Sequence, residues 1–426
     1  MGSQDTERKI SIMNVGVLDL RKASAEDIAR IAKIVNVGLV LCPGDPAELL
    51  AGVSSVNTGN IVQVPADVQF QLEQGNTRFS RAYFEGRAGP LNLIVVGSSQ
   101  VDPDVPEEEI EDKLGRLVVI GSLSVPEHLD ETVRRKIHTV VGSVRTYRCP
   151  PSAQFTHGAL TLDEGYLEKL GDGAEFAVLG DLRLPQVLPD ALLRRKFGAL
   201  YVTGTITCHQ ENVAALREAL AGEDVSFKTI PAGFTLVEEP LVIDSAALAS
   251  LPGDKLYCTR RVQIEPDVSA AALDEHLAAL IGKESVFCPA ALKGVIAVKA
   301  DWTVTQVVLY EGALWIVDDE RQLPAYALEA LDGVATLVVF GELTLDPAIA
   351  PETIAAHLAK VHNMGKIACT PEQMAAIEPL LGMRDGDLVD ATRVESAPAG
   401  KPEREEEEEE EKEEFEFRGN SAYLVL

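Results

Sequence analysis

The sequence predicts an α/β repeat solenoid of leucine-rich-repeat-like geometry, in which parallel strands line one face and short helices line the other. Three observations predict this fold class. The 426 residues contain five copies of a segment about 80 residues long. Each copy carries glycines at fixed places beside strand-like runs, and helix-like segments separate these runs. A strand followed by a helix and another strand implies parallel pairing.

Two glycine positions mark each copy. The first follows an apolar run and is occupied by Gly16, Gly97, Gly180 and Gly341. The second is occupied by Gly38, Gly121, Gly204 and Gly365. Copy four departs from this pattern, with Arg260 at the first position, Arg261 beside it and Glu284 at the second. The two positions lie 24 residues apart in copies two, three and five, and 21 residues lead from Gly121 to Gly142. Each copy is therefore expected to consist of smaller strand-plus-helix units.

Copy two shows the expected elements in order. Pro106 begins its first helix, and glutamates follow in the first turn, where the positive end of the helix dipole stabilises carboxylates. Ile110 and Leu114 lie four residues apart and therefore face the core together. Val133 and Ile137 do the same in the second helix, over residues 127–137. Strands are expected over residues 91–101, 117–125, 139–148 and 159–162, with a helical turn over residues 166–170.

The repeats divide the chain into one polar segment and five units. The polar segment covers residues 1–9, and the repeats cover residues 10–91, 92–173, 174–254, 255–334 and 335–426. Only short turns, such as residues 171–173 and 251–254, separate neighbouring repeats. Short turns favour the stacking of one repeat on the next. Five compact α/β modules strung like beads are the alternative arrangement.

A glutamate-rich run between Glu403 and Glu416 lies in the last repeat. Copies one to four each end in a strand-like segment, and so does the chain, at residues 422–426. The interval before this last segment exceeds the others by the length of residues 395–418. We predict an acidic loop inserted at about residues 395–418, after which the terminal strand returns to the sheet. Solvated charge that repels a second copy is one interpretation of the loop. Binding of a basic partner or of cations is the alternative.

Composition limits the classes of partner. The net charge of −29 argues against a nucleic-acid-binding surface and against an anionic membrane surface. The first residues do not resemble a signal peptide, and no apolar run is long enough for a membrane-spanning helix. We therefore expect a cytoplasmic protein that binds another protein or itself.

The six cysteines are expected to be structural. Four of them share one repeat position: Cys42, Cys208, Cys288 and Cys369. Copy two has Val125 there, which indicates a slot for a small apolar side chain. No pair of cysteines has the spacing of a metal-binding or redox motif. The adjacent Cys208 and His209 would point to opposite faces of a strand. We predict no metal site and no cofactor.

Few residues qualify as candidates for chemistry. Phosphate-binding, zinc-protease and serine-hydrolase motifs are absent from the sequence. Aspartates recur where strands end, at Asp102, Asp104, Asp163, Asp244, Asp301 and Asp346. Turn capping is the simpler role for them, and a row of functional carboxylates is the alternative. Trp302, Trp315 and Tyr310 form an aromatic concentration in copy four. Packing in the core or in a cap is the simpler role for them, and a ligand-binding surface patch is the alternative.

The sequence favours a non-enzymatic scaffold. In this interpretation, a repeat array presents an extended surface for protein binding or self-assembly, and no catalytic residue is predicted. The alternative is an enzyme or binding protein that acts on an extended polymer, such as a polysaccharide. It would act through the rim of the solenoid on which the six strand-end aspartates lie, which we call the rim aspartates. An active site requires one copy to break the pattern with converging polar residues. Copy four breaks it most, at Arg260, Arg261 and Glu284.

Overall fold

The computed structural model describes residues 9–65, 68–87, 89–222, 225–391 and 416–426. These residues form an α/β fold in which every pair of neighbouring strands is parallel. The predicted class of parallel strands with short helices is therefore confirmed. A single continuous solenoid is not, because the strands divide into eight separate sheets and none of them closes into a barrel.

The sheets group the strands into five modules. Module 1 contains β1 (Ile10–Asp19), α1 (Ala25–Ala29), β2 (Ile31–Cys42), α2 (Pro46–Leu49), β3 (Ser54–Gln63) and β30 (Glu416–Val425), in the sheet order β3-β2-β1-β30. Module 2 contains β4 (Gln71–Phe79), α3 (Arg81–Phe84), β5 (Leu91–Val101), α4 (Glu107–Lys113), β6 (Leu114–Pro126), η1 (Glu127–Leu129), α5 (Asp130–Lys136) and β7 (Ile137–Tyr147), in the sheet order β4-β5-β6-β7.

Modules 3 and 4 have two sheets each. Module 3 contains β8 (Gln154–His157), β9 (Leu160–Thr161), α6 (Glu164–Lys169), β10 (Ala174–Leu179), β11 (Leu182–Arg183), α7 (Asp190–Lys196), β12 (Phe197–Val202), β13 (Ile206–His209), η2 (Gln210–Asn212), α8 (Val213–Ala219) and β14 (Phe227–Ile230). Module 4 contains β15 (Thr235–Val237), β16 (Leu241–Ile243), η3 (Ala247–Ser250), β17 (Lys255–Cys258), β18 (Val262–Ile264), α9 (Ala270–His276), β19 (Ala279–Gly282), β20 (Val286–Pro289), η4 (Ala290–Leu292), α10 (Lys293–Lys299) and β21 (Val307–Tyr310).

Module 5 also has two sheets. It contains β22 (Ala313–Val317), β23 (Glu320–Leu323), α11 (Ala325–Glu329), β24 (Ala335–Val339), β25 (Glu342–Leu345), α12 (Pro351–His357), β26 (Leu358–Asn363), β27 (Lys366–Cys369), α13 (Pro371–Ile377), η5 (Glu378–Leu380), β28 (Leu381–Arg384) and β29 (Asp387–Asp390). In modules 3 to 5, most turns of the chain therefore supply one strand to each of two adjacent sheets, whereas β14 and β21 end their modules as the single strands of their turns.

Glycines mark the bend of each turn because neighbouring backbones touch there. Gly97, Gly121 and Gly142 are paired in register and have φ of 120°, 125° and 136°. A Cβ on Gly121 or Gly142 would collide with the carbonyl oxygen of the preceding glycine in the column. Both the positive φ and the close approach exclude other residues at these positions. The glycine columns of the sequence are thus the points where stacked turns come closest.

The core of each module lies between its sheet and its helices. In module 2 the predicted inward residues Ile110, Leu114 and Val133 are buried in one apolar cluster, and Ile137 packs against it. The predicted cysteine column is buried as well, with Cys42, Cys208, Cys288 and Cys369 each 0% exposed. Val125, the copy-two counterpart, is equally buried. The slot is therefore a core position, as the valine indicated.

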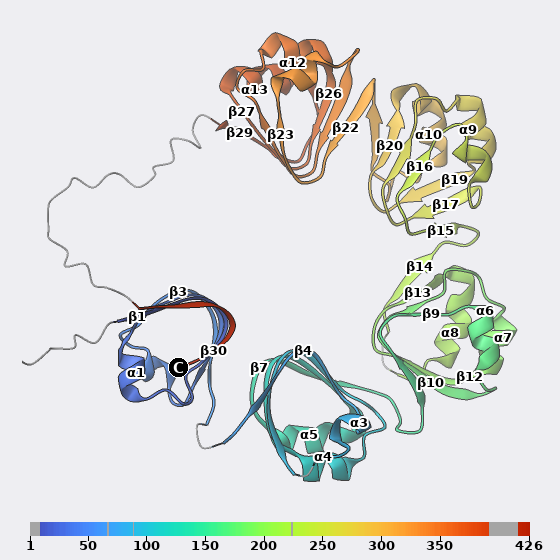
Figure 1. The fold of residues 1–426 in the computed structure, drawn as a ribbon. Coiled ribbons are helices and arrows are strands. Elements are labelled where there is room, and N and C mark those ends of the chain that lie inside the picture. The colour runs from blue at the N-terminus through green and yellow to red at the C-terminus, as the bar shows by residue number, and fades with distance from the viewer. Residues whose placement is uncertain (1–8, 66–67, 88, 223–224, 392–415) are drawn as a thin grey trace, which may run out of the picture.

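Figure 1 shows the modules following one another around an incomplete circle, with modules 1 and 5 at its two ends. The helices of modules 2 to 5 lie on the outer side of this arc and the strands on its inner side. Modules 1 and 2 share an apolar cluster in which Val17 and Leu41 meet Ile94 and Val118. Among the described residues, no helix combines the length and apolar character needed to span a bilayer.

The C-terminal strand does not pair where the sequence predicts. The predicted terminal strand exists as β30, but it begins at Glu416, inside the predicted insertion, and pairs with β1 of module 1 rather than with the last repeat. Residues 392–415, which hold most of the predicted loop, lie outside the described residues. Figure 1 shows β30, in red, lying along the blue strands at the start of the chain.

An asparagine ladder accompanies this pairing. Asn36 Nδ2 donates to Asn14 Oδ1 at 3.0 Å, and Asn57 Nδ2 donates to Asn36 Oδ1 at 2.8 Å. Asn14 Nδ2 donates in turn to Asn420 Oδ1 at 3.1 Å. The ladder therefore runs through all four strands of module 1, including β30.

Candidate functional site at the joint between modules 4 and 5

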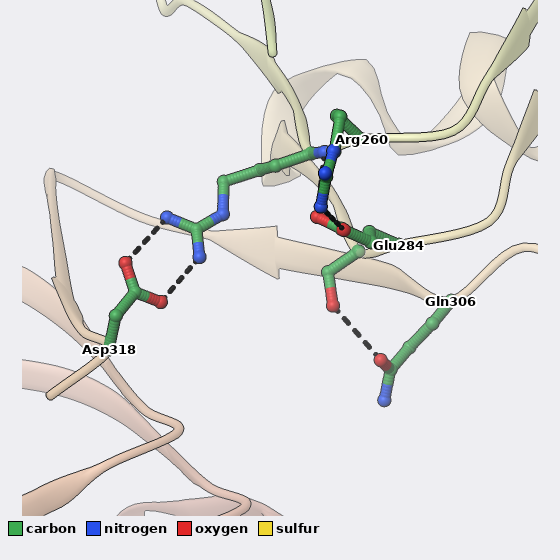
Figure 2. Close-up of polar contacts among 6 residues, drawn as sticks. Arg260, Glu284, Gln306 and Asp318 are labelled. Atoms are coloured by element: carbon green, nitrogen blue, oxygen red, sulfur yellow. Dashed lines mark hydrogen bonds and ion pairs between the residues drawn. The ribbon is translucent and has the colours of Figure 1, made fainter. Parts of the chain in front are cut away.

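The residues that break the glycine pattern in copy four bind one another. Arg260 and Arg261 follow β17, and Glu284 follows β19. Arg260 Nη1 donates to Glu284 Oε1 at 3.2 Å, and the backbone N–H of Arg261 donates to Glu284 Oε2 at 3.1 Å (Figure 2). One carboxylate thus holds the turn that a pair of stacked glycines forms in other copies. The two departures from the pattern are a single structural change.

The Arg261 side chain reaches into the next module. Its Nη1 and Nη2 donate to the two carboxylate oxygens of Asp318, which follows β22, at 3.0 and 2.5 Å (Figure 2). The guanidinium carbon also lies 5.6 Å from the ring centroids of both Phe287 in module 4 and Phe340 in module 5. A two-pronged ion pair with aromatic contacts fixes the guanidinium plane as well as its charge. Arg261 therefore connects module 4 to module 5.

Modules 4 and 5 also share an apolar cluster. Phe287, Val308 and Tyr310 of module 4 are buried against Val338 of module 5. Gln306 is the polar member of this contact. Its Oε1 accepts from Ser285 Oγ at 3.0 Å, and its Nε2 lies within hydrogen-bond reach of Met364 Sδ at 3.7 Å and Met383 Sδ at 3.6 Å. The arrangement pairs each of these polar groups with a neighbour.

The aromatic residues of copy four do not form one patch. Tyr310 is buried in the joint, and its hydroxyl donates to the carbonyl oxygen of Ile264 at 2.6 Å. Trp315 packs against the core of module 5. Trp302 is 47% exposed, and its indole N–H donates to the carbonyl oxygen of Ala297 at 3.2 Å. The structure thus places the three residues in three separate environments.

Four of the six rim aspartates accept hydrogen bonds from their own turns. Asp163 Oδ1 accepts the N–H of Tyr166 at 2.6 Å and begins α6, and Asp346 Oδ1 accepts the N–H of Ala348 at 2.8 Å. Asp244 and Asp301 accept in the same way from backbone groups two or three residues later. Hydrogen bonds from Thr303 lower the pKa of Asp301. These contacts are those of turn capping.

Asp102 differs from the other rim aspartates because it is buried at the boundary between modules 2 and 3. It is 1% exposed, and Arg78 Nε donates to its two oxygens at 3.0 and 2.7 Å. His157 of module 3 lies with Nε2 3.2 Å from Asp102 Oδ1. Burial lowers the pKa of His157, against the opposing effect of the Asp102 charge. The nearby Asp104 has a buried Oδ1 with no protein partner among the described residues.

Sequence reasoning missed this second polar cluster. The sequence pattern groups Asp102 and Asp104 with the turn aspartates, and no local motif marks Arg78 or His157. One signal was present, because the last strands of modules 2 and 4 end in a tyrosine. Tyr147 OH donates to the carbonyl oxygen of Val101 at 2.5 Å, as Tyr310 does to Ile264. A tyrosine at the end of the last strand thus marks both joints.

The predicted cysteine–histidine neighbours also lie in the core. Cys208 and His209 are both buried, and His209 Nε2 lies 2.9 Å from the carbonyl oxygen of Pro185. In the part of the chain that the structure describes, no three His, Cys, Asp or Glu side chains gather as metal ligands would.

A surface hollow lies between modules 1 and 2. It measures about 740 Å³ and is lined by residues of β3 and β7, by Pro65 after β3 and by Pro43 after β2. The residues of the two strands are Ile61, Val62, Gln63, His138, Thr139 and Val141. Among the described strands, β3 and β7 are edge strands, each with a neighbour on one side only. Val56 on β3 and Val140 on β7 are exposed nearby in sequence. Unpaired strand edges with apolar side chains are the features that extended peptides bind.

Comparisons with known protein families, with curated proteins and with solved structures found no match for this chain.

Proposed function

We propose that this chain is a non-enzymatic scaffold: short solenoid turns of leucine-rich-repeat-like geometry, grouped into modules, present a long strand-lined surface for protein binding or self-assembly. The observation that carries the proposal is the use of Arg261. An active site is expected where a repeat breaks its pattern with polar residues, yet here the break joins two modules through Asp318. The polar groups of copy four support the architecture rather than a reaction.

The sheet edges supply the binding surface in this proposal. All eight sheets of the described residues end in strands that have one neighbour only. Such edges pair readily with another extended chain. The hollow between β3 and β7 offers two of them side by side. The cytoplasm is the proposed location, since all six cysteines are free and a reducing compartment keeps thiols in that state.

A photo-crosslinking experiment tests the binding surface. A photoreactive residue replaces Val56 on edge strand β3, and in a matched control it replaces Val298 on α10, which is 82% exposed. The proposal predicts a discrete protein adduct from position 56 and none from position 298. It also predicts loss of the adduct in the Ile61→Lys variant, because a charge on the strand edge opposes pairing. Equal adducts from both positions, or an adduct insensitive to Ile61→Lys, would contradict the proposal.

The second candidate function is binding or cleavage of an extended polymer such as a polysaccharide. The buried Asp102, paired with Arg78 and close to His157, favours it, as does the unpartnered oxygen of Asp104. Calorimetric titration with a panel of oligosaccharides separates the two candidates. Saturable binding that is lost in Asp104→Asn would favour the polymer, and absence of heat with every oligosaccharide would favour the scaffold.

A further inference from the structure

The C-terminal strand completes a module at the opposite end of the chain. β30 pairs with β1 in continuous register from Ile10 with Glu416 to Asp19 with Val425. Tyr423 OH donates to Asp19 Oδ2 at 2.5 Å, and the N–H of Leu426 donates to the carbonyl oxygen of Asp19 at 3.2 Å. Leu424 and Leu426 pack against the apolar core of module 1. The last residues of the chain are thus part of the first module.

Residue types show that β30 is specific for module 1. Its segment Asn420-Ser421-Ala422 is in register with Asn14-Val15-Gly16, and the asparagine recurs at the same position. The four ladder asparagines, Asn14, Asn36, Asn57 and Asn420, are the only residues other than glycine with positive φ in the described chain. A Cβ on Gly16 would lie 2.6 Å from the carbonyl oxygen of Ala422, so the two strands fit only with glycine there.

In the other modules the first strand directly precedes the second along the chain, as β4 precedes β5. Module 1 instead receives its first strand from beyond module 5, across the 24 residues 392–415. None of the contacts of β30 with module 1 depends on which copy of the chain provides the strand. An identical β30 from a second copy would make the same backbone pairs, the same asparagine ladder and the same hydrogen bond to Asp19.

We propose that β30 is exchanged between copies, so that the C-terminal strand of one chain completes module 1 of the next. This inference rests on the self-assembly part of the proposed function and names its partner, a second copy of this chain. Each copy has one donor strand and one acceptor edge on β1, so assembly proceeds head to tail. A module 1 that has lost β30 exposes the edge of β1 and the apolar core beneath it, which favours recapture of a strand from any copy.

Concentration decides between closure within one chain and exchange between chains. A strand supplied by the same chain competes at an effective concentration that short linkers place in the millimolar range. Closure within one chain should therefore dominate at micromolar protein concentration. At protein concentrations below the millimolar range, the fraction of chains with an exchanged β30 should increase in about direct proportion to the protein concentration.

Disulfide trapping between two full-length variants tests the exchange. Val15 and Ser421 are opposite each other in the β1–β30 register, and neighbouring strands bring such residues within disulfide range. One chain carries Val15→Cys and the other carries Ser421→Cys, and the two are mixed, incubated and oxidised. A matched control replaces the second chain by Val425→Cys, whose register partner is Asp19. The six native cysteines are buried and should not compete.

We expect a disulfide-linked heterodimer from the first mixture, with a yield at least about tenfold above that of the Val425→Cys control and rising with concentration. The double variant Val15→Cys with Ser421→Cys, at low concentration, should form the disulfide within one chain. If the double variant closes but the mixture never links, exchange is overturned, while the scaffold proposal and its cross-linking test are untouched. If neither links, the pairing of β30 with β1 is itself overturned.

Discussion

Replacing Arg261 by alanine should loosen module 5 from module 4. The substitution removes a two-pronged ion pair with Asp318 and two contacts with aromatic rings. The ion pair is partly exposed, at 30% for Arg261 and 50% for Asp318, so solvent screening limits it to about 0.5–1 kcal/mol. The aromatic contacts add about 0.5–1 kcal/mol. We expect Arg261→Ala to lower the free energy of unfolding by about 1–2 kcal/mol.

Arg260→Ala is the matched control, because Arg260 binds Glu284 within module 4 and is more exposed. It should cost less than about 0.5 kcal/mol. Denaturant unfolding gives both values, and hydrogen exchange locates them, with faster exchange expected in β20 and β22 for Arg261→Ala. Equal effects of the two substitutions, or unchanged exchange in these strands, would refute the assignment of Arg261 to the joint.

Three further predictions concern the core and the closing strand. Thiol reagents should label the native protein far more slowly than the denatured protein, because burial raises the pKa of Cys42 and Cys208 to about 11 and that of Cys288 to about 12; rapid native labelling would contradict the core assignment. Leu277→Asp should cost about 3–5 kcal/mol by placing a charge in the core of module 4, whereas exposed Val298→Asp should change the melting temperature little. Burial would raise the pKa of Asp19, but hydrogen bonds from Arg21 and Tyr423 outweigh it and hold the pKa below its usual value. Its contribution is therefore present at neutral pH and is lost as pH falls through that lowered pKa; chemical-shift titration of module 1 should show this loss in the native chain and not in Asp19→Asn.

The repeat pattern predicted the parallel strands and their buried faces because those properties are local. Glycine spacing marks where backbones touch, and the spacing of Ile110 and Leu114 marks which side of a helix faces the sheet. The phase of the repeat could not be predicted in this way. A tandem pattern can be divided at any point, and the sheets group the strand at the end of each predicted repeat with the strands that follow it.

The partners of individual residues were the hardest to predict. The break at Arg261 was visible, but its partner Asp318 lies 57 residues away in another module, and no local spacing connects them. The partner of β30 was predictable in principle, because Asn420 matches Asn14 and the small Ala422 stands in register with Gly16. The apolar residues 422–426 do not reveal that match by themselves, since apolar runs occur in every copy.

Removal of Tyr423–Leu426 tests most directly the central claim that the end of the chain completes module 1. Hydrogen exchange is measured across β1 in the full-length and truncated proteins, with β5 of module 2 as the internal reference. The account predicts faster exchange near Val17, Leu18 and Asp19, whose register partners are removed, with unchanged exchange in β5 and a lower melting temperature. Identical exchange in β1 and identical melting of the two proteins would contradict it.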